Sequence, residues 1–315
     1  MRCLSLGMSS TSSKTGRYSH EKRAQITREV RKLRLQTHDA LHVPEAEVTD
    51  VVEALTEGQT HLRTNDTVPA EVIVERLRRK HEEFSLLQTL IGPHRVLSLE
   101  EYSDVYERTG LDVDGRKQRI ETWMINAENC VDGVVRFCKS VPGFRDLSIV
   151  DQTNLLKQSR VEVWFLGAYK GFDADLKTVH VPNGNCFHRF ELSQFLGQDY
   201  VDCALQLAVR LKSLGLTSEE TVVLKAICVM SADRCALDQP REVEERHWDL
   251  VKCLLHLLAK DESRGPGLFA RVVSALIALR TLSEFAGQHI KNTLVADAAR
   301  TVSYTHLTLP TSSYV

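Results

Sequence analysis

The sequence predicts an all-α protein that contains one small β-hairpin. Hydrophobic residues make up 43% and charged residues 26% of its 315 residues, which is the composition of a globular protein. From residue 69 to about residue 299, apolar residues recur at helical spacing. Residues 173–190 alone break that spacing, around Asn183-Gly184, a pair typical of a tight turn between two strands.

The first 68 residues have a different composition. Residues 14–34 contain eight basic and two acidic residues, although the net charge of the chain is only −2. A nearly neutral chain with one basic arm does not fit a protein that coats nucleic acid. Residues 36–68 are acidic and contain Pro44 and Gly58, which favours a flexible linker with a weak helix near residues 45–55.

Two helices are predicted in the next part of the chain. The first spans 69–91, because proline suits the first turn of a helix and Gly92-Pro93 cannot continue one. The second spans 116–140 and ends at Val141-Pro142-Gly143. Its apolar residues recur at steps of three and four along one face: Trp123, Ala127, Cys130, Val131, Val134, Phe137 and Cys138.

A third helix begins after Ser148, a good N-cap residue, and is apolar on most sides, which is typical of a buried helix. The hairpin follows, with strands at 178–181 and 186–190. A capping box at residues 217–220 then predicts the start of another helix. The remaining helices are expected at 200–214, 218–236, 241–260 and 268–298.

Catalytic and metal-binding patterns are poor, so we expect the chain not to be an enzyme. Its 12 histidines do not follow a metal-ligand spacing, and there is no glycine-rich phosphate loop and no GxSxG segment. The eight cysteines include no CxxC pair and mostly lie in apolar runs, which favours a reducing compartment. No apolar run approaches the ~20 residues that span a bilayer, so we expect no membrane partner.

One pair of segments is specific. Residues 137–147 read FCKSVPGFRDL, and residues 151–157 read DQTNLLK. Together they resemble the signature of the nuclear receptor ligand-binding domain, in which a helix ends in lysine and Pro-Gly-Phe and the next helix carries Asp-Gln-x-x-Leu-Leu-Lys. The resemblance covers about residues 69–299 and is nearest to the thyroid-hormone-receptor-like subfamily, especially its vitamin D receptor branch.

The resemblance implies a three-layer antiparallel helical sandwich and a division of the chain into four parts. Residues 1–35 would be the remnant and basic extension of a zinc-finger DNA-binding domain, 36–68 a flexible hinge, and 69–300 the ligand-binding domain. Cys3 would be the last zinc ligand, and zinc would be held only in the full-length protein, since a structural site needs four ligands. The basic arm would contact DNA phosphates, or else serve as a solvated linker or nuclear-import signal.

We expect residues 301–315 to be a non-native tail on a fragment. They contain no acidic residue, include Pro310 and resemble translated sequencing-adapter sequence. The family instead has a short activation helix with a glutamate that completes a coregulator groove. Without that helix, the chain is expected to bind longer corepressor helices better than LxxLL coactivator helices.

The resemblance also implies a pocket for a small lipophilic ligand. Its lining would include Trp123, Ala127, Cys130, Trp164, Gly167 and Ala168. Two polar anchors of related receptors are missing. Gly167 stands where the vitamin D receptor branch has an arginine, and Ala286 stands where related receptors offer a histidine. The ligand therefore differs from those of the relatives, or these residues are plain core.

Three further roles follow from the resemblance. Lys139 and Lys157 would lie at the rim of the coregulator groove, where a lysine caps the last carbonyls of a docked helix. Glu162 and Arg234 would form the ion pair of the heterodimerising receptors, with a retinoid X receptor-like partner. The dimer surface would come from the last long helix, through a stripe of four residues: Leu268, Val272, Leu276 and Leu279.

The sequence thus predicts the hinge and ligand-binding domain of a nuclear, ligand-regulated, DNA-binding transcription factor. Two alternatives stay open at this point. One is a module that works without ligand, through dimerisation and corepressor binding. The other is a lipid carrier or enzyme with an unrelated all-helical fold.

Overall fold

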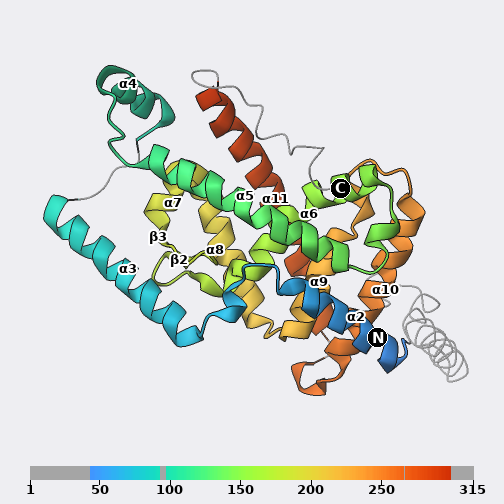
Figure 1. Ribbon diagram of the computed structural model, residues 1–315. Coiled ribbons are helices and arrows are strands. Elements are labelled where there is room, and N and C mark those ends of the chain that lie inside the picture. The colour runs from blue at the N-terminus through green and yellow to red at the C-terminus, as the bar shows by residue number, and fades with distance from the viewer. Residues whose placement is uncertain (1–42, 93–96, 266, 299–315) are drawn as a thin grey trace, which may run out of the picture. The chain divides into compact units, whose positions relative to one another are not determined.

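The computed structural model describes residues 43–92, 97–265 and 267–298. The chain divides into two compact units, Met1–Pro44 and Glu45–Val315, and the helices and strands named below all belong to the second (Figure 1). Cys3, the basic arm and residues 301–315 lie outside the described residues. Within the described part of the chain, no helix is both long and apolar enough to cross a bilayer.

The helices of the second unit follow one another with short connections. They are α2 (Glu45–Gln59), α3 (Ala70–Ile91), α4 (Leu99–Thr109), α5 (Arg116–Ser140), α6 (Ile149–Ala168), α7 (Arg189–Leu196), α8 (Gln198–Ser213), α9 (Ser218–Val229), α10 (Pro240–Ala259) and α11 (Leu268–Ala298). Single 3-10 turns join several of them: η3 (Asn65–Thr67), η4 (Phe144–Asp146), η5 (Tyr169–Gly171), η6 (Ala232–Arg234) and η7 (Glu262–Arg264).

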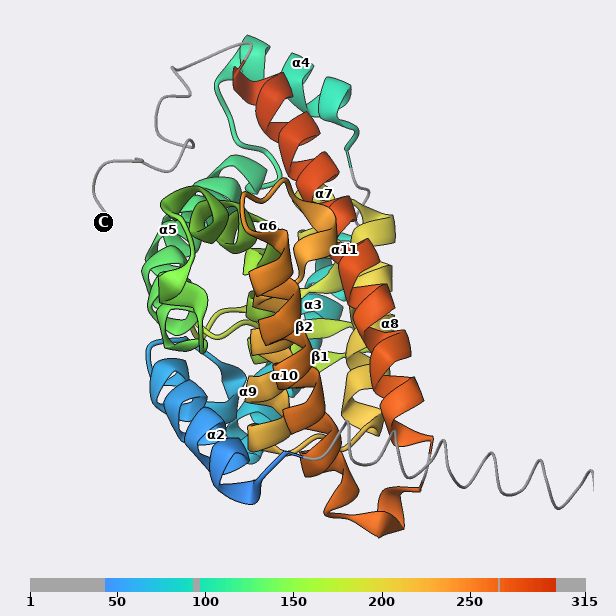
Figure 2. The same cartoon turned by 90° about the vertical axis from the view of Figure 1, so that its right-hand side faces the viewer.

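These helices form three layers. Figure 2 shows α5 and α2 on one side, α6 and α9 in the centre, and α8 and α11 on the other side. The central helix α9 is buried along its length from Glu220 to Val229, as a helix between two layers must be. It packs against α6, α10 and α2. The predicted all-α three-layer sandwich is therefore confirmed.

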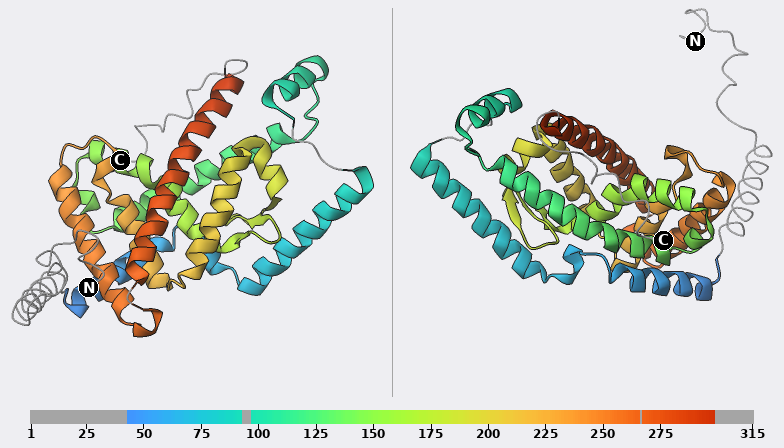
Figure 3. Two further views of the ribbon diagram at one scale, coloured as in Figure 1. Left: turned by 180° about the vertical axis from the view of Figure 1, so that it is seen from behind. Right: turned by 45° about the horizontal axis from the view of Figure 1, so that its top comes forward.

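A small antiparallel sheet lies between the helices, in the order β1 (Phe172–Asp173), β2 (Thr178–His180) and β3 (Cys186–His188). The register pairs Val179 with both Phe172 and Phe187. The predicted hairpin is present, with Gly184 at φ 92° in its turn, and β1 adds a third strand. Helix α3 crosses the outside of β2 and β3, as Figure 3 shows from two further sides.

His188 links the sheet to α3 and to the start of α7. Its ring stacks on Phe84 of α3, with ring centroids 3.6 Å apart. Its Nδ1 accepts a hydrogen bond from the backbone N–H of Phe190, at 3.2 Å, which requires the neutral ring. The side chain is buried, and this burial lowers the pKa of His188 to about 4.

This environment predicts a loss of stability in mild acid. Because the folded pKa lies below the unfolded value, the contribution of His188 is present above pH ~6.5 and is lost as the pH falls toward 4. Between pH 7 and pH 5, the free energy of unfolding should fall by about 2 kcal/mol from this residue. Urea unfolding of the wild type and of His188→Asn at pH 7 and pH 5 measures this change in the free energy of unfolding. An equal pH-dependent loss in both proteins would contradict the assignment.

The segment predicted as a linker contains the helix predicted near residues 45–55, but this helix is longer and packed. Residues 45–59 form α2, and Val48 and Leu55 are buried where this helix packs against α5 and α9. The folded unit therefore begins near Glu45, and the segment expected as a hinge overlaps it. The last turns of the helix predicted at 218–236 are also different, because α9 ends at Val229 and η6 follows.

Candidate coregulator-docking site

The turn between α5 and α6 is held by backbone geometry and one arginine. Gly143 has φ 79°, a conformation that L side chains rarely adopt, and its missing Cβ would lie 2.8 Å from Nε of Arg246. Phe144 is buried in η4. The Nε of Arg145 donates to the backbone oxygen of Lys139 at 2.7 Å, which satisfies a carbonyl at the end of α5. The turn has a single defined shape.

Asp151 anchors the first turn of α6. Ser148 caps this helix by accepting from the N–H of Asp151 at 3.1 Å. The Asp151 carboxylate is fully buried and accepts from the backbone N–H groups of Asp238 and Gln239, at 2.7 and 2.9 Å. A buried carboxylate needs such donors, and they come from the loop before α10.

The neighbouring polar residues of the DQTN segment complete this connection. The Nε2 of Gln152 donates to the carbonyl oxygen of Leu147 at 2.8 Å. The Nδ2 of Asn154 donates to Ala236 at 2.9 Å. In return, Gln239 Oε1 accepts from the N–H of Ser148 at 3.0 Å. The signature residues thus bind the loop before α10 to the beginning of α6.

The two predicted groove lysines lie on this pair of helices. Lys139 is half-buried in the last turn of α5, and Lys157 is exposed on α6. Ile149 and Val150, in the first turn of α6, are both more than half exposed. The packed helices α5 and α6 therefore present two apolar side chains and two cations at their surface.

Glu162 and Arg234 form the ion pair that the sequence predicted. Glu162 lies in α6 and is 1% exposed, and Arg234 reaches it from η6 through an Nη1 hydrogen bond to Oε1. Burial raises the pKa of the Glu162 carboxyl, and the charge of Arg234 opposes that rise. Gln158, with its amide oxygen turned toward the guanidinium, accepts from Nε of Arg234 at 2.7 Å. The pair joins α6 to the loop after α9.

Comparison with known proteins decides the family. A family model described as the ligand-binding domain of nuclear hormone receptor matches residues 121–291, more than half of the chain. The chain belongs to this family. Its members are regulators rather than enzymes, and the match runs from α5 into α11, across the turn and the ion pair described above.

The curated relatives cover parts of this nuclear receptor chain. "Nuclear receptor subfamily 1 group D member 2" of Rattus norvegicus is 30% identical over 56% of this chain and 31% of its own length. "Ecdysone-inducible protein E75" of Galleria mellonella is 32% identical over 49% of this chain and 22% of its own. "Nuclear hormone receptor E75" of Metapenaeus ensis is 26% identical over 90% of this chain and 45% of its own. The chain thus spans less than half of the relatives it matches.

The predicted pocket residues of the receptor domain are only partly described. The side chains of Trp123 and Ala127 lie outside the described residues. Cys130 and Trp164 are half-buried, and burial raises the pKa of the Cys130 thiol. Ala168 is buried, and its carbonyl accepts from Asn65 Nδ2 at 2.8 Å.

Gly167 lies beside the segment that precedes η3. A Cβ on this residue would lie 3.0 Å from Cγ2 of Thr64, so the segment before η3 covers that side of α6. The Asn65 amide holds this segment in place, because its Nδ2 also donates to the His180 carbonyl at 2.9 Å. Gly167 therefore contacts the segment before η3 on this side of α6.

The last helix also corrects a prediction. In the expected dimer stripe, Leu268, Val272 and Leu279 are at most 3% exposed, because this face of α11 packs against α8 and α6. Among the described side chains of the helix, the exposed large apolar ones are Val273, Ile277 and Phe285, which lie four and eight positions apart. A stripe at helical spacing marks a buried face, and here that face is the core.

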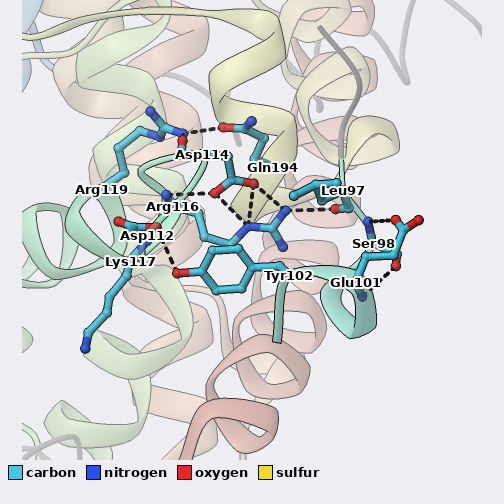
Figure 4. A network of polar contacts seen from close by, with 10 residues as sticks. All are labelled: Leu97, Ser98, Glu101, Tyr102, Asp112, Asp114, Arg116, Lys117, Arg119 and Gln194. Carbon is cyan, nitrogen blue, oxygen red and sulfur yellow. Dashed lines mark hydrogen bonds and ion pairs between the residues drawn. The ribbon is translucent and has the colours of Figure 1, made fainter. Parts of the chain in front are cut away.

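A polar cluster that the sequence analysis missed secures the start of α5 (Figure 4). Arg116 is 4% exposed, pairs with Asp114 at 2.7 Å and lies 4.4 Å above the ring of Tyr102. The hydroxyl of Tyr102 donates to Asp112 at 2.8 Å. Asp112 also accepts from the N–H of Gln118, in the first turn of α5, at 3.1 Å. The signal for this cap was the Asp-x-Asp spacing just before the helix.

Proposed function

We propose that this chain supplies ligand binding, dimerisation and coregulator docking to a ligand-regulated, DNA-binding transcription factor of the nucleus. The observation that carries the proposal is the surface made by the end of α5, the turn η4 and the start of α6, residues 137–157, which we call the α5–α6 wall. Arg145 fixes its turn by donating to the Lys139 carbonyl, and the loop before α10 fixes the start of α6 through the buried Asp151. A fixed turn whose two helices present exposed apolar residues and cations suits an amphipathic helix, which docks its apolar face and has a partial negative charge at its C-terminus.

Replacing Lys139 with alanine should weaken the binding of an LxxLL peptide about five- to tenfold. A cation near the last carbonyls of a docked helix contributes about 1 kcal/mol, which corresponds to that factor. Fluorescence polarisation with a labelled peptide measures it. Arg108→Ala, at an exposed pair on α4, is the matched control and should bind as the wild type does. Equal affinities for the wild type and Lys139→Ala would contradict the assigned role.

The same assay compares the two classes of coregulator. We expect a longer corepressor helix to bind more tightly than an LxxLL helix. Tighter coactivator binding would count against this part of the proposal.

For dimerisation we propose the exposed stripe Val273, Ile277 and Phe285 of α11 as the contact surface, with a retinoid X receptor-like partner. Three apolar residues on one face of a long helix fit the core of an interface. DNA and zinc would be bound by zinc modules of the full-length protein ending at Cys3. Among the residues that the structure describes, no group of three His, Cys, Asp or Glu side chains could hold a metal ion.

A small lipophilic molecule remains the proposed regulator, acting by population shift. At a hundred times its dissociation constant, such a ligand stabilises the state it prefers by ~2.7 kcal/mol. One observation favours the second candidate, a ligand-independent dimerisation and corepressor module: Thr64 covers the side of Gly167 where an anchoring arginine was expected. Native mass spectrometry of protein purified from its own cells separates the two. A retained lipid supports ligand regulation, and a mass equal to the bare chain supports the second candidate. The family match sets aside an unrelated all-helical lipid protein.

A further inference from the structure

The C-terminal end of α3 is an exposed apolar helix. Residues 85–91 are all exposed, and their large apolar side chains are Leu86, Leu87, Leu90 and Ile91, at 59%, 45%, 72% and 71% exposure. The turns before them are fixed to the body. Leu77 and Phe84 are buried, and Lys80 pairs with Glu191 of α7 at 2.9 Å. A rigid helix end that gathers apolar side chains in solvent marks an interaction site.

The spacing of these residues matches one kind of contact. Leu87, Leu90 and Ile91 lie at positions i, i+3 and i+4, so they share one face of the helix. This is the spacing of the LxxLL helices proposed for the α5–α6 wall, with isoleucine in the last place. Helix-in-groove contacts use anchors at these positions.

The charges of the two surfaces are also complementary. The last carbonyls at a helix C-terminus lack intrahelical partners and carry a partial negative charge, and α3 ends at Ile91 before Gly92. Glu82, one turn before Leu86, is exposed as well, and the exposed Glu83 pairs with Arg79 at 3.8 Å. The wall of α5 and α6 carries Lys139, and Lys157 and Arg160 are exposed on α6. The partial negative charge of the helix end thus complements the cations on the surface of α5 and α6.

The two surfaces cannot meet within one copy of the chain. Figure 1 shows the end of α3 on the side where α5 begins, whereas the α5–α6 turn lies where α5 ends. A helix of 25 residues is about 37 Å long at 1.5 Å per residue. Because α3 is fixed on β2 and β3, its end cannot cross that distance. The contact must therefore join two molecules.

We propose that the end of α3, residues 87–91, docks on the α5–α6 wall of a second copy of this chain. This inference rests on the proposed coregulator function of that wall. Two copies that exchange their helix ends form a closed pair, and one-way docking forms a head-to-tail chain. Either arrangement occupies the coregulator site, so self-association and coregulator binding exclude each other. A two-turn contact is small, which gives a dissociation constant on the order of 10 µM.

Sedimentation velocity of the full chain, at concentrations around the expected dissociation constant, tests the contact. Two variants are used, and each disrupts one of the two contacting surfaces. Leu90→Glu breaks the helix end, and Lys139→Glu breaks the wall. Each variant alone should self-associate at least about tenfold more weakly than the wild type. An equimolar mixture should form one-to-one pairs, because one intact helix end and one intact wall remain. Val74→Glu is the matched control, an exposed apolar residue near the other end of α3, and it should behave as the wild type.

Three results would overturn the inference: a wild type that stays monomeric, self-association of Leu90→Glu equal to that of the wild type, or a mixture that does not pair. A labelled LxxLL peptide separates this failure from failure of the proposed function. If the peptide binds Leu90→Glu while that variant still self-associates, only the inference fails. If the peptide binds neither the wild type nor Leu90→Glu, the docking site itself is contradicted and both proposals fail.

Discussion

Replacing Arg234 with methionine is expected to lower the free energy of unfolding by about 3–5 kcal/mol at pH 7. The change leaves Glu162, which is 1% exposed, without its guanidinium partner. Burial already raises the pKa of Glu162 with Arg234 present, so desolvation of this carboxylate is substantial. Without Arg234 the carboxylate retains that penalty and loses the attraction that opposes it.

Urea unfolding measures the effect, and two variants serve as controls. Arg108→Met removes an ion pair with Asp104 in which both side chains are more than half exposed, and it should change stability by less than about 1 kcal/mol. The double variant Glu162→Leu, Arg234→Met removes both charges and should recover most of the loss. The loss in Arg234→Met should also become smaller as the pH falls, because the raised pKa of Glu162 favours the neutral carboxyl, which needs no partner. A loss no larger than that of Arg108→Met would contradict this account.

Replacing Asp151 with alanine is expected to cost about 2–4 kcal/mol. The backbone N–H groups of Asp238 and Gln239 would lose their acceptor, and each unsatisfied buried donor costs about 1–3 kcal/mol. Asp151→Asn keeps one acceptor oxygen and should lie between the wild type and Asp151→Ala. Thermal and urea unfolding give the values.

Asp146→Ala is the matched control, since Asp146 is an exposed aspartate in the same turn region. Its effect should stay within about 0.5 kcal/mol. The Asp151 variants should also bind coregulator helices more weakly, because the loop before α10 no longer fixes the start of α6. An Asp151→Ala protein as stable as Asp146→Ala would show that the carboxylate does not hold that loop.

The long helices could be predicted because residues close to each helix end determine where the helix begins and stops. The range predicted for α5, 116–140, is the one observed, since Val141-Pro142-Gly143 cannot continue a helix and apolar residues mark one face throughout. Ser148 caps α6 as expected, and Thr217 and Glu220 form the predicted capping box of α9. These signals act within one helical turn, so they can be recognised without knowledge of the fold.

Helix α2 was predicted only as a weak helix near residues 45–55, and α4 was missed although Ser98 and Glu101 form a capping box and Gly110 ends the helix. The buried residues of α2 are Val48, Leu55 and Gly58, too few for a clear periodic signal in an acidic segment. Helix α4 is held through Tyr102 by two residues beyond its C-terminal end. Arg116 lies over the Tyr102 ring, and Asp112 accepts a hydrogen bond from the Tyr102 hydroxyl. The strand β1 has two residues, fewer than any alternation pattern needs.

The Glu162–Arg234 ion pair could be predicted because residue type and position carry the information. A glutamate inside an apolar helix requires a partner, and the family pattern pointed to Arg234. It was harder to predict whether an apolar helix face points to the core or to solvent. The stripe through Val272 and Leu279 was recognised, but spacing alone does not tell whether a stripe meets the core or a partner molecule. Gly167 likewise meets Thr64 because residues far earlier in the chain return to α6.

Hydrogen–deuterium exchange of the chain, with and without a bound coregulator helix, tests the central claim most directly. If the wall from Phe137 to Lys157 is the docking surface, the amides protected by the peptide should lie in the last turns of α5, in η4 and in the first turns of α6. Protection centred on another part of the molecule, or none at saturating peptide, would contradict the claim.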